Sequence, residues 1–108
     1  MNQEDKDWKL KLRYGKFKTT FQHFTVLADG EVGQLVDGFE CPPGRAWMAM
    51  KAWATDSNES ADMIQVIGEQ IGFTVDGKIE IYETEPEQAP RDKPYGYAIG
   101  FTPYDAEA

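Results

Sequence analysis

The sequence predicts an α+β domain, with a mostly antiparallel sheet of about five strands and one amphipathic helix, at about residues 57–71, on one face of the sheet. Two observations predict this class. Only Asp56 to Phe73 has the one-sided apolar spacing of a helix, and most of the remaining chain alternates apolar with polar residues, as strands do. Proline and glycine clusters separate the alternating stretches.

The helix has a start signal, an apolar face and a stop signal. Asp56, followed three residues later by Glu59, has the form of a capping box. Gly72 supplies a left-handed cap, and Phe73 follows it as the hydrophobic contact to the last turn. The expected buried face consists of Ala61, Ile64, Gly68 and Ile71. Because glycine inside a helix costs about 1 kcal/mol relative to alanine, we expect another backbone to pass close to Gly68.

The first third of the chain predicts a hairpin. Trp8 to Tyr14 and Phe17 to Val26 alternate with a two-residue period, and Gly15 separates them. The Asp29-Gly30 pair is a turn signal, so the second strand is expected to end there. Glu31 to Val36 is a candidate for one more edge strand.

The remaining strands follow from similar signals. Cys41-Pro42-Pro43-Gly44 cannot lie inside a sheet and predicts a connector. Ala46 to Thr55 is apolar on both faces, which is typical of a central strand. Later strands are expected at Ile79–Tyr82, after an Asp76-Gly77 turn, and at Tyr95–Phe101, with Pro103 at its end. Between them, Thr84 to Pro94 holds three prolines and predicts a stiff loop that stands off the body.

The length of 108 residues predicts a single domain, residues 1–108, with frayed ends at residues 1–6 and 105–108. A single cysteine, Cys41, excludes an internal disulfide. The first residues, Met1 to Asp5, do not resemble a secretory leader, and no apolar run is long enough for a membrane span. We therefore expect a cytoplasmic protein without membrane contact.

Charge is unevenly distributed along the chain. The net charge is −8, but residues 1–18 hold six basic and three acidic residues, while residues 19–108 hold five and sixteen. So acidic a body argues against nucleic acid as a partner. The basic residues of the first predicted hairpin form a candidate docking face: Lys9, Lys11, Arg13, Lys16 and Lys18. They fit either charged protection of a sheet edge or docking on an acidic surface, such as Glu83–Glu87 of a second copy.

No catalytic, cofactor-binding or metal-ligating residue is predicted, and no cofactor is expected. Cys41 and His23 could form a thiolate–imidazole pair only if the fold brought them together, and a packed or edge histidine is the alternative. Asp56, Asn58 and Ser60 match the first ligand positions of a calcium loop. Ala61 and Ile67 then replace the glycine and glutamate that the loop needs, so the helix-cap interpretation is preferred.

The function hypotheses come from a comparison of areas. A helix about 22 Å long and 10 Å wide covers about half of a five-stranded sheet that is about 24 Å across. The strands carry aromatic residues beyond that half, so we expect a candidate interface or pocket made of Trp8, Phe17, Phe21, Trp47, Trp53, Tyr97 and Phe101.

Two functions are compatible with that surface, and the net charge suggests a third. The first is a non-enzymatic protein-interaction module that acts as a homodimer or higher homo-oligomer, possible protein partners included. The second is a protein or enzyme that binds a small apolar ligand in an aromatic-lined pocket between a curled sheet and the helix. The third, suggested only by the net charge of −8, is an acidic inhibitor of a basic toxin or nuclease.

The back half of the chain, from Trp47 through Gly72-Phe73 to the stretch Gly96–Asp105, resembles small uncharacterised bacterial proteins carried on mobile integron gene cassettes. The resemblance lies in the general layout of this half. It implies a small bacterial α+β protein and brings no known active residues with it.

Overall fold

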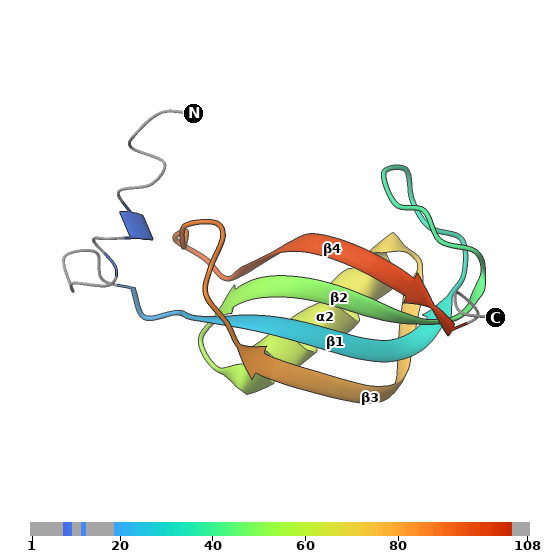
Figure 1. Cartoon of the computed structure of the whole chain (residues 1–108), viewed down its shortest axis with the longest axis horizontal. Coiled ribbons are helices and arrows are strands. Elements are labelled where there is room, and N and C mark those ends of the chain that lie inside the picture. Colours follow the sequence, from blue (N-terminus) through green and yellow to red (C-terminus); the bar gives the residue numbers. More distant parts are fainter. Residues whose placement is uncertain (1–7, 10–11, 13–18, 105–108) are drawn as a thin grey trace.

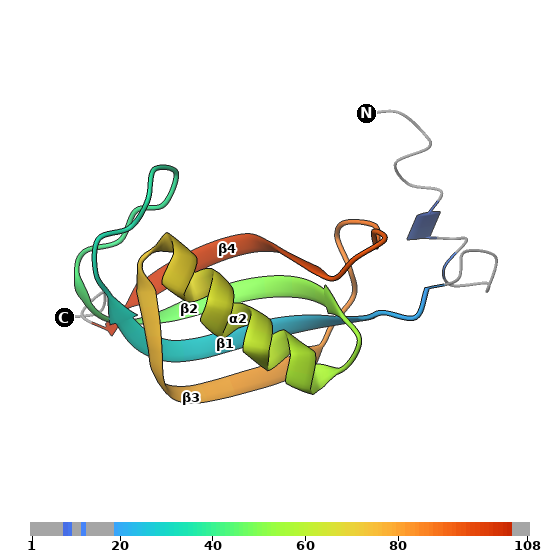
Figure 2. The same ribbon diagram turned by 180° about the vertical axis from the view of Figure 1, so that it is seen from behind.

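The computed structural model describes Trp8, Lys9, Leu12 and residues 19–104. Within them, a four-stranded antiparallel sheet carries one long helix across a single face (Figures 1 and 2). The elements are β1 (Gln22–Val32), β2 (Gly44–Ala54), α2 (Ser57–Ile71), β3 (Phe73–Glu83) and β4 (Tyr95–Pro103). The strand order is β3-β1-β2-β4, so β3 and β4 form the two edges of the sheet. The α+β class is confirmed, with four strands in place of about five.

Helix α2 begins and ends where its capping residues predict. The backbone N–H of Glu59 donates to Asp56 Oδ1 at 2.8 Å, while Glu59 Oε1 accepts from the Thr55 N–H at 2.6 Å. Gly72 has a φ of 108° and closes the helix in the left-handed region. The carbonyl oxygen of Phe73 lies 3.1 Å from the place of a Cβ on Gly68. This confirms that a backbone approaches the helix at Gly68.

The hydrophobic core fills the space between α2 and the sheet. Alternate residues of β1 and β2 point toward the helix and are fully buried, among them Val26, Met48 and Met50. Ile64 and Ile71 of α2 meet them, as Figure 2 shows from the helix side. The loop of residues 33–43 adds Leu35, Phe39 and Cys41 to the same core. The helix therefore does not cover this face alone.

The N-terminal part of the predicted sheet is wrong where the structure describes it. Trp8, Lys9 and Leu12 are helical, so they do not form the expected strand, and the rest of residues 8–18 lies outside the described residues. Strand β1 runs straight through Asp29-Gly30 instead of turning there. Glu31 and Val32 complete β1, and residues 33–36 are loop, so the extra edge strand is also wrong.

Bulges replace the expected Asp76-Gly77 turn and interrupt the expected alternation of Tyr95–Phe101. Asp76-Gly77 is an irregularity inside a continuous β3, because one residue of β1, between Ala28 and Gly30, lies opposite three residues of β3, between Val75 and Ile79. In β4 an extra residue lies near Ala98, whose φ is 53°. The side chains of Tyr95 and Tyr97 consequently lie on one face of the sheet, and Ile99 and Phe101 pack against the core on the other.

The loop of residues 84–94 lacks regular secondary structure, as its prolines predict. It does not stand off the body, however. It folds back over one end of the sheet and connects edge strand β3 to edge strand β4 (Figure 1). No helix among the described residues has the length and apolar character needed to cross a membrane.

Candidate functional site

We call the sheet face opposite α2 the open face, because no helix within residues 19–104 lies over it (Figure 1). Strand register arranges its side chains in rows from β3 through β1 and β2 to β4. The rows are Glu80, Leu27, Ala49 and Gly100; then Tyr82, Thr25, Lys51 and Tyr97; then His23, Trp53 and Tyr95. These rows are the candidate functional surface.

The centre of the open face is apolar and has little side-chain bulk. Leu27 and Ala49 are register partners on the two central strands, and both are only half-buried. At Gly100, beside Ala49, an added Cβ would meet no atom of the described residues within 4 Å. Among the described residues, this central strip of Leu27, Ala49 and Gly100 is therefore only partly covered.

Residues 84–94, which we call the covering segment, close one end of the open face. Trp53 Nε1–H donates to the carbonyl of Gln88 at 2.7 Å, and the Tyr95 hydroxyl donates to the carbonyl of Ala89 at 2.5 Å. Lys51 Nζ lies 2.6 Å from a carboxylate oxygen of Glu87. With this segment in place, Trp53 is 2% exposed and Tyr97 is 9% exposed.

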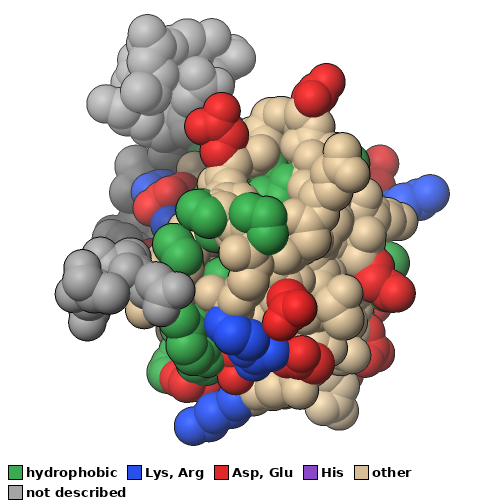
Figure 3. Space-filling view, turned by 90° about the vertical axis from the view of Figure 1, so that its right-hand side faces the viewer, with side chains coloured by type: hydrophobic (Ala, Val, Ile, Leu, Met, Phe, Trp, Pro, Cys, Tyr) green, Lys and Arg blue, Asp and Glu red, His purple; other side chains and the backbone are tan. Residues whose placement is uncertain are grey.

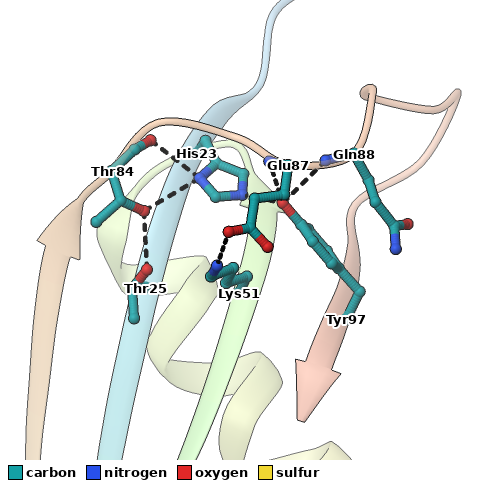
Figure 4. Close-up of polar contacts among 7 residues, drawn as sticks. All are labelled: His23, Thr25, Lys51, Thr84, Glu87, Gln88 and Tyr97. Atoms are coloured by element: carbon teal, nitrogen blue, oxygen red, sulfur yellow. Dashed lines mark hydrogen bonds and ion pairs between the residues drawn. The ribbon is translucent and has the colours of Figure 1, made fainter. Parts of the chain in front are cut away.

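The imidazole of His23 lies at the centre of these contacts (Figure 4). Its Nδ1 is 3.0 Å from the Thr84 carbonyl oxygen and 3.2 Å from Thr84 Oγ1. Its Nε2 is 2.6 Å from the Tyr97 hydroxyl. That hydroxyl in turn accepts the backbone N–H groups of Glu87 at 2.9 Å and Gln88 at 3.2 Å. Histidine and tyrosine thus join β1 and β4 to the covering segment.

Electrostatics around the site follow from burial and one ion pair. Burial lowers the pKa of His23, and Lys51 lowers it further, while the hydrogen bond to Thr84 and the carboxylates of Glu87 and Glu85 raise it. The hydrogen bond and charge of Lys51 hold the pKa of the Glu87 carboxyl below its usual range. At neutral pH the ring is therefore uncharged and the Lys51–Glu87 pair is intact.

A cluster of charges lies at the opposite end of the open face. Arg45 donates from Nη1 to both carboxylate oxygens of Asp76, at 2.7 and 2.8 Å, and from Nη2 to Asp29 at 2.8 Å. The Tyr104 hydroxyl also donates to Asp29, and its ring stacks on Trp47 with the centroids 6.4 Å apart. These contacts neutralise Arg45 and fix Trp47 beside the central strip.

A hollow of about 560 Å³ lies where β1 begins, next to the covering segment. Its walls include Leu12, Phe21, Trp53 and Pro86, and its polar groups come from Thr19, Gln22, His23, Glu83 and Thr84. Such a volume falls within the range of small-molecule sites. The hollow is on the open side of the sheet and not between the sheet and the helix.

The structure does not gather the seven candidate aromatic residues into one surface. Trp53 and Tyr97 lie beneath the covering segment, and Phe101 packs against Phe73 on the helix side, with their ring centroids 5.5 Å apart. Trp47 lies at the far end of the open face and Phe21 lines the hollow. Trp8 is half-buried, and Phe17 lies outside the described residues.

Of the candidate basic docking face, only Lys9 is described. Its Nζ lies 5.8 Å from the centroid of the Trp8 ring, and its charge contributes to the lowered pKa of Glu87. Lys11, Arg13, Lys16 and Lys18 lie outside the described residues. The docking hypothesis therefore stays a prediction.

The described residues support neither the Cys41–His23 nucleophile pair nor a metal site. Cys41 precedes β2, whereas His23 pairs with Trp53 near the other end of that strand, so the two side chains are separated by the length of the hairpin. Both ring nitrogens of His23 are already in hydrogen bonds. The part of the chain that is described holds no cluster of three or more potential metal ligands.

Sequence reasoning missed the central strip and the partners of His23. Leu27 and Ala49 are ordinary strand residues, and nothing local marks them as uncovered. Tyr97 and Thr84 are 74 and 61 residues away from His23 in the chain, and only the fold brings them together. The alternation of Ala46 to Thr55 did contain one signal, because it placed Trp47, Ala49, Lys51 and Trp53 on a common face.

Comparisons of the chain with protein families, with curated proteins and with solved structures give no match. The resemblance to integron cassette proteins therefore stays a prediction.

Proposed function

We propose that the protein is a non-enzymatic interaction module that acts as a homodimer, with the open faces of its two sheets packed against each other. The observation that carries this proposal is the central strip. Leu27, Ala49 and Gly100 form an apolar floor on two inner strands and one edge strand, which the described residues cover only in part. A second sheet could lie over this floor at the usual spacing of about 10 Å.

Charge favours a second copy in this orientation. The helix with its caps (residues 55–72) and the loop of residues 33–44 together carry six acidic residues and no lysine or arginine. All five basic residues of the stretch 19–104 lie on β2, β3 or the covering segment. Packing sheet against sheet would direct the acidic helices away from each other and bring the more neutral faces together.

The charged residues at the two ends of the open face are already paired. Arg45 is bound to Asp29 and Asp76 at one end, and Lys51 to Glu87 at the other. Unpaired charges in an interface are costly to desolvate, whereas paired ones cost less. The face can therefore be covered without leaving any of these five groups unpaired.

The available area also fits a dimer. A sheet of four strands, each up to 11 residues long, measures about 19 by 36 Å, or roughly 700 Å². Standard interfaces bury about 800 Å² on each partner. The outer surface of the covering segment would add to the contact. A reducing compartment suits the single Cys41, and we assign the module to the cytoplasm as part of the proposal.

The test is the mass in solution of the natural chain and of Leu27→Glu, by light scattering over a concentration series. The natural chain is expected at twice 12.2 kDa. Leu27→Glu places two carboxylates in a two-fold interface, so we expect the dissociation constant to rise roughly 30-fold or more, equivalent to about 2 kcal/mol or more. Gly100→Glu should act in the same way, since its side chain would enter free space.

Val66→Glu is the matched control, because Val66 lies on α2 and is 54% exposed. It adds the same charge on the helix side and should leave the dimer intact. A natural chain that stays monomeric at every concentration, or a dimer that Val66→Glu disrupts and Leu27→Glu does not, would refute the sheet-to-sheet arrangement. Circular dichroism of each variant checks that the fold is retained.

The hollow beside the covering segment favours a second candidate function, the binding of a small apolar ligand. Phe21, Trp53 and Pro86 supply its apolar wall, and its volume of about 560 Å³ would hold a small molecule. Native mass spectrometry of the freshly purified protein tests this. A bound small molecule that Phe21→Ala releases would support the candidate. A chain without any adduct, which also fails to increase the fluorescence of a hydrophobic dye, would contradict it.

A further inference from the structure

The hydrogen bonds of His23 determine which of its ring nitrogens carries the proton. A carbonyl oxygen can only accept, so Nδ1, which lies 3.0 Å from the Thr84 carbonyl, must donate. In the neutral ring Nε2 then has no hydrogen and accepts from the Tyr97 hydroxyl at 2.6 Å. The Tyr97 hydroxyl donates its hydrogen to Nε2, and its oxygen accepts hydrogen bonds from the N–H groups of Glu87 and Gln88.

This arrangement is complete only when His23 is neutral. Protonation would add a hydrogen to Nε2 and direct it at a hydroxyl oxygen that already accepts two N–H groups. The Tyr97 proton would at the same time lose its acceptor. Because these groups are buried, an unsatisfied donor cannot readily turn to water, and the conflict costs free energy.

We propose that His23 and Tyr97 form a proton-operated latch: protonation of His23 releases the covering segment from the open face and exposes Trp53 and Tyr97. The covering segment is the part that gives way, because Thr84, Glu87 and Gln88 hold it to the latch through their backbone groups. Strands β1 and β4, in contrast, are fixed in the sheet by their own hydrogen bonds. The latch does not depend on the proposed dimer.

His23 stays neutral in preference to charged, given its burial and the charged and titratable groups around its ring. Lys51 faces it from β2, Glu85 and Glu87 from the covering segment, and Tyr97 from β4. Burial and Lys51 outweigh the hydrogen bond to Thr84 and the two carboxylates, so the folded-state pKa of His23 lies below the ordinary value of 6.5. Glu87 keeps its charge through this range, because its own pKa is lowered.

The direction of the pH effect follows from these shifts. A histidine whose pKa is lowered by folding stabilises the closed state fully above its unfolded value of 6.5. That contribution decreases as the pH falls below 6.5 and is lost once the pH has fallen through the folded-state pKa. The contribution of His23 thus begins to fall at a higher pH than the range of about 4 in which unperturbed carboxyl groups titrate.

The experiment measures the latch at both of its ends. His23 is the only histidine in the chain, so an NMR titration of its ring gives its pKa without ambiguity. Hydrogen exchange then gives the protection factors of the Glu87 and Gln88 amides at about pH 7.5 and about pH 5. We expect a pKa below 6.5 and a loss of protection of about tenfold for each unit of that shift, once the ring is protonated.

Two variants and one matched control complete the test. Tyr97→Phe should remove protection of both amides already at about pH 7.5, whereas Tyr82→Phe, on the same face but 50% exposed, should not. In His23→Gln the protection factors, whatever their size, should no longer change with pH. If the His23 ring titrates at or above 6.5, or if both amides keep their protection after the ring is protonated, the latch is refuted.

Discussion

Gly30 shows how a single residue can be required by a neighbour that is distant in the chain. A Cβ at this position would lie 2.1 Å from the carbonyl oxygen of Thr74 and 2.7 Å from the ring of Phe73. The Phe73 ring, which is fully buried, passes over the strand where any other residue would have its side chain. Asp29-Gly30 is therefore a strand sequence in this fold, although the same pair usually indicates a turn.

Gly30→Ala is predicted to destabilise the protein strongly. Because one of the clashing atoms belongs to the backbone of β3, the overlap cannot be relieved by rotating a side chain, and either β1 or β3 must shift. Overpacking of this kind costs about 2–4 kcal/mol. Chemical denaturation of the natural chain and the variant measures the difference in the free energy of unfolding.

Gly33→Ala is the matched control for that measurement. A Cβ on Gly33, just after β1, would lie 3.5 Å from the carbonyl oxygen of Gly72, which is an ordinary contact. We expect a change within about 0.5 kcal/mol of zero. Equal losses in the two variants would mean that the close approach of Phe73 and Thr74 does not limit the residue at position 30.

His23 marks the limit of prediction at the residue scale. Its place among strand residues indicated a packed or edge histidine, and the structure shows it 6% exposed. Its partners could not be predicted, because the Thr84 carbonyl and the amides bound to Tyr97 are backbone groups that any residue would supply. The sequence therefore predicts the burial of such a ring better than it predicts the hydrogen-bond partners of the ring.

At the scale of elements, the helix was predictable because all its signals are local. The cap of Asp56 and the left-handed Gly72 are both within one residue of the helix they terminate. The central strand was predictable for a similar reason, since both of its faces are largely apolar. The bounds Ser57–Ile71 and Gly44–Ala54 agree closely with the expected ones.

The edges of the sheet were less predictable, because their register depends on neighbouring strands. The bulge near Ala98 reverses the face on which the rest of β4 packs, so Tyr97 and Phe101 lie on opposite sides despite their even spacing. In β3, Asp76-Gly77 similarly bulges beside Asp29, which lies where a Gly77 side chain would be. A strict alternation rule cannot detect either irregularity.

The covering segment was half predictable. Its prolines correctly exclude regular secondary structure, but they also suggested that it would stand off the body. It packs down because buried aromatic side chains need hydrogen-bond partners, and its carbonyls at Gln88 and Ala89 satisfy Trp53 and Tyr95. The composition of a loop predicts its stiffness but not the surface against which it packs.

At the scale of the whole molecule, area alone did not determine which surface remains uncovered. The helix side is completed by Leu35, Phe39 and Cys41 of the loop that precedes β2, and one end of the open face by the covering segment. What remains is the central strip of the open face. The exposed large apolar side chains among the described residues are Val36, Val66, Tyr82 and Tyr104, of which Tyr82 lies on the open face and Tyr104 at its end.

The distribution of charge distinguishes the two ways in which copies of this chain could associate. Figure 3, viewed from the end where the loop of residues 33–43 lies, shows acidic side chains spread over the surface, with lysine and arginine side chains interspersed. Two copies packed through their open faces, each with a net charge of −8, repel each other over long distances. Copies that dock the basic N-terminal face onto the acidic segment Glu83–Glu87 attract each other instead.

Salt is therefore predicted to strengthen a dimer formed through the open faces. Raising the salt from about 0.01 M to about 0.3 M shortens the screening length from about 30 Å to below 10 Å, which removes most of the repulsion and leaves the apolar contact. The dissociation constant measured by sedimentation equilibrium should fall several-fold over this range. The Lys51–Glu87 and Arg45–Asp29 pairs lie within each copy, so their screening should affect the two states of association equally.

The opposite result has a clear meaning. If the dimer dissociates as salt is added, attraction between unlike charges holds it together, and the N-terminal lysines docked on Glu83–Glu87 become the better explanation. Replacing Lys9 and Lys11 by glutamine would then weaken the dimer at low salt, whereas Leu27→Glu would have little effect. For a dimer held by the central strip, Leu27→Glu separates the copies. The lysine changes make the net charge of each copy more negative, from −8 to −10, so they weaken this dimer only slightly, and only at low salt.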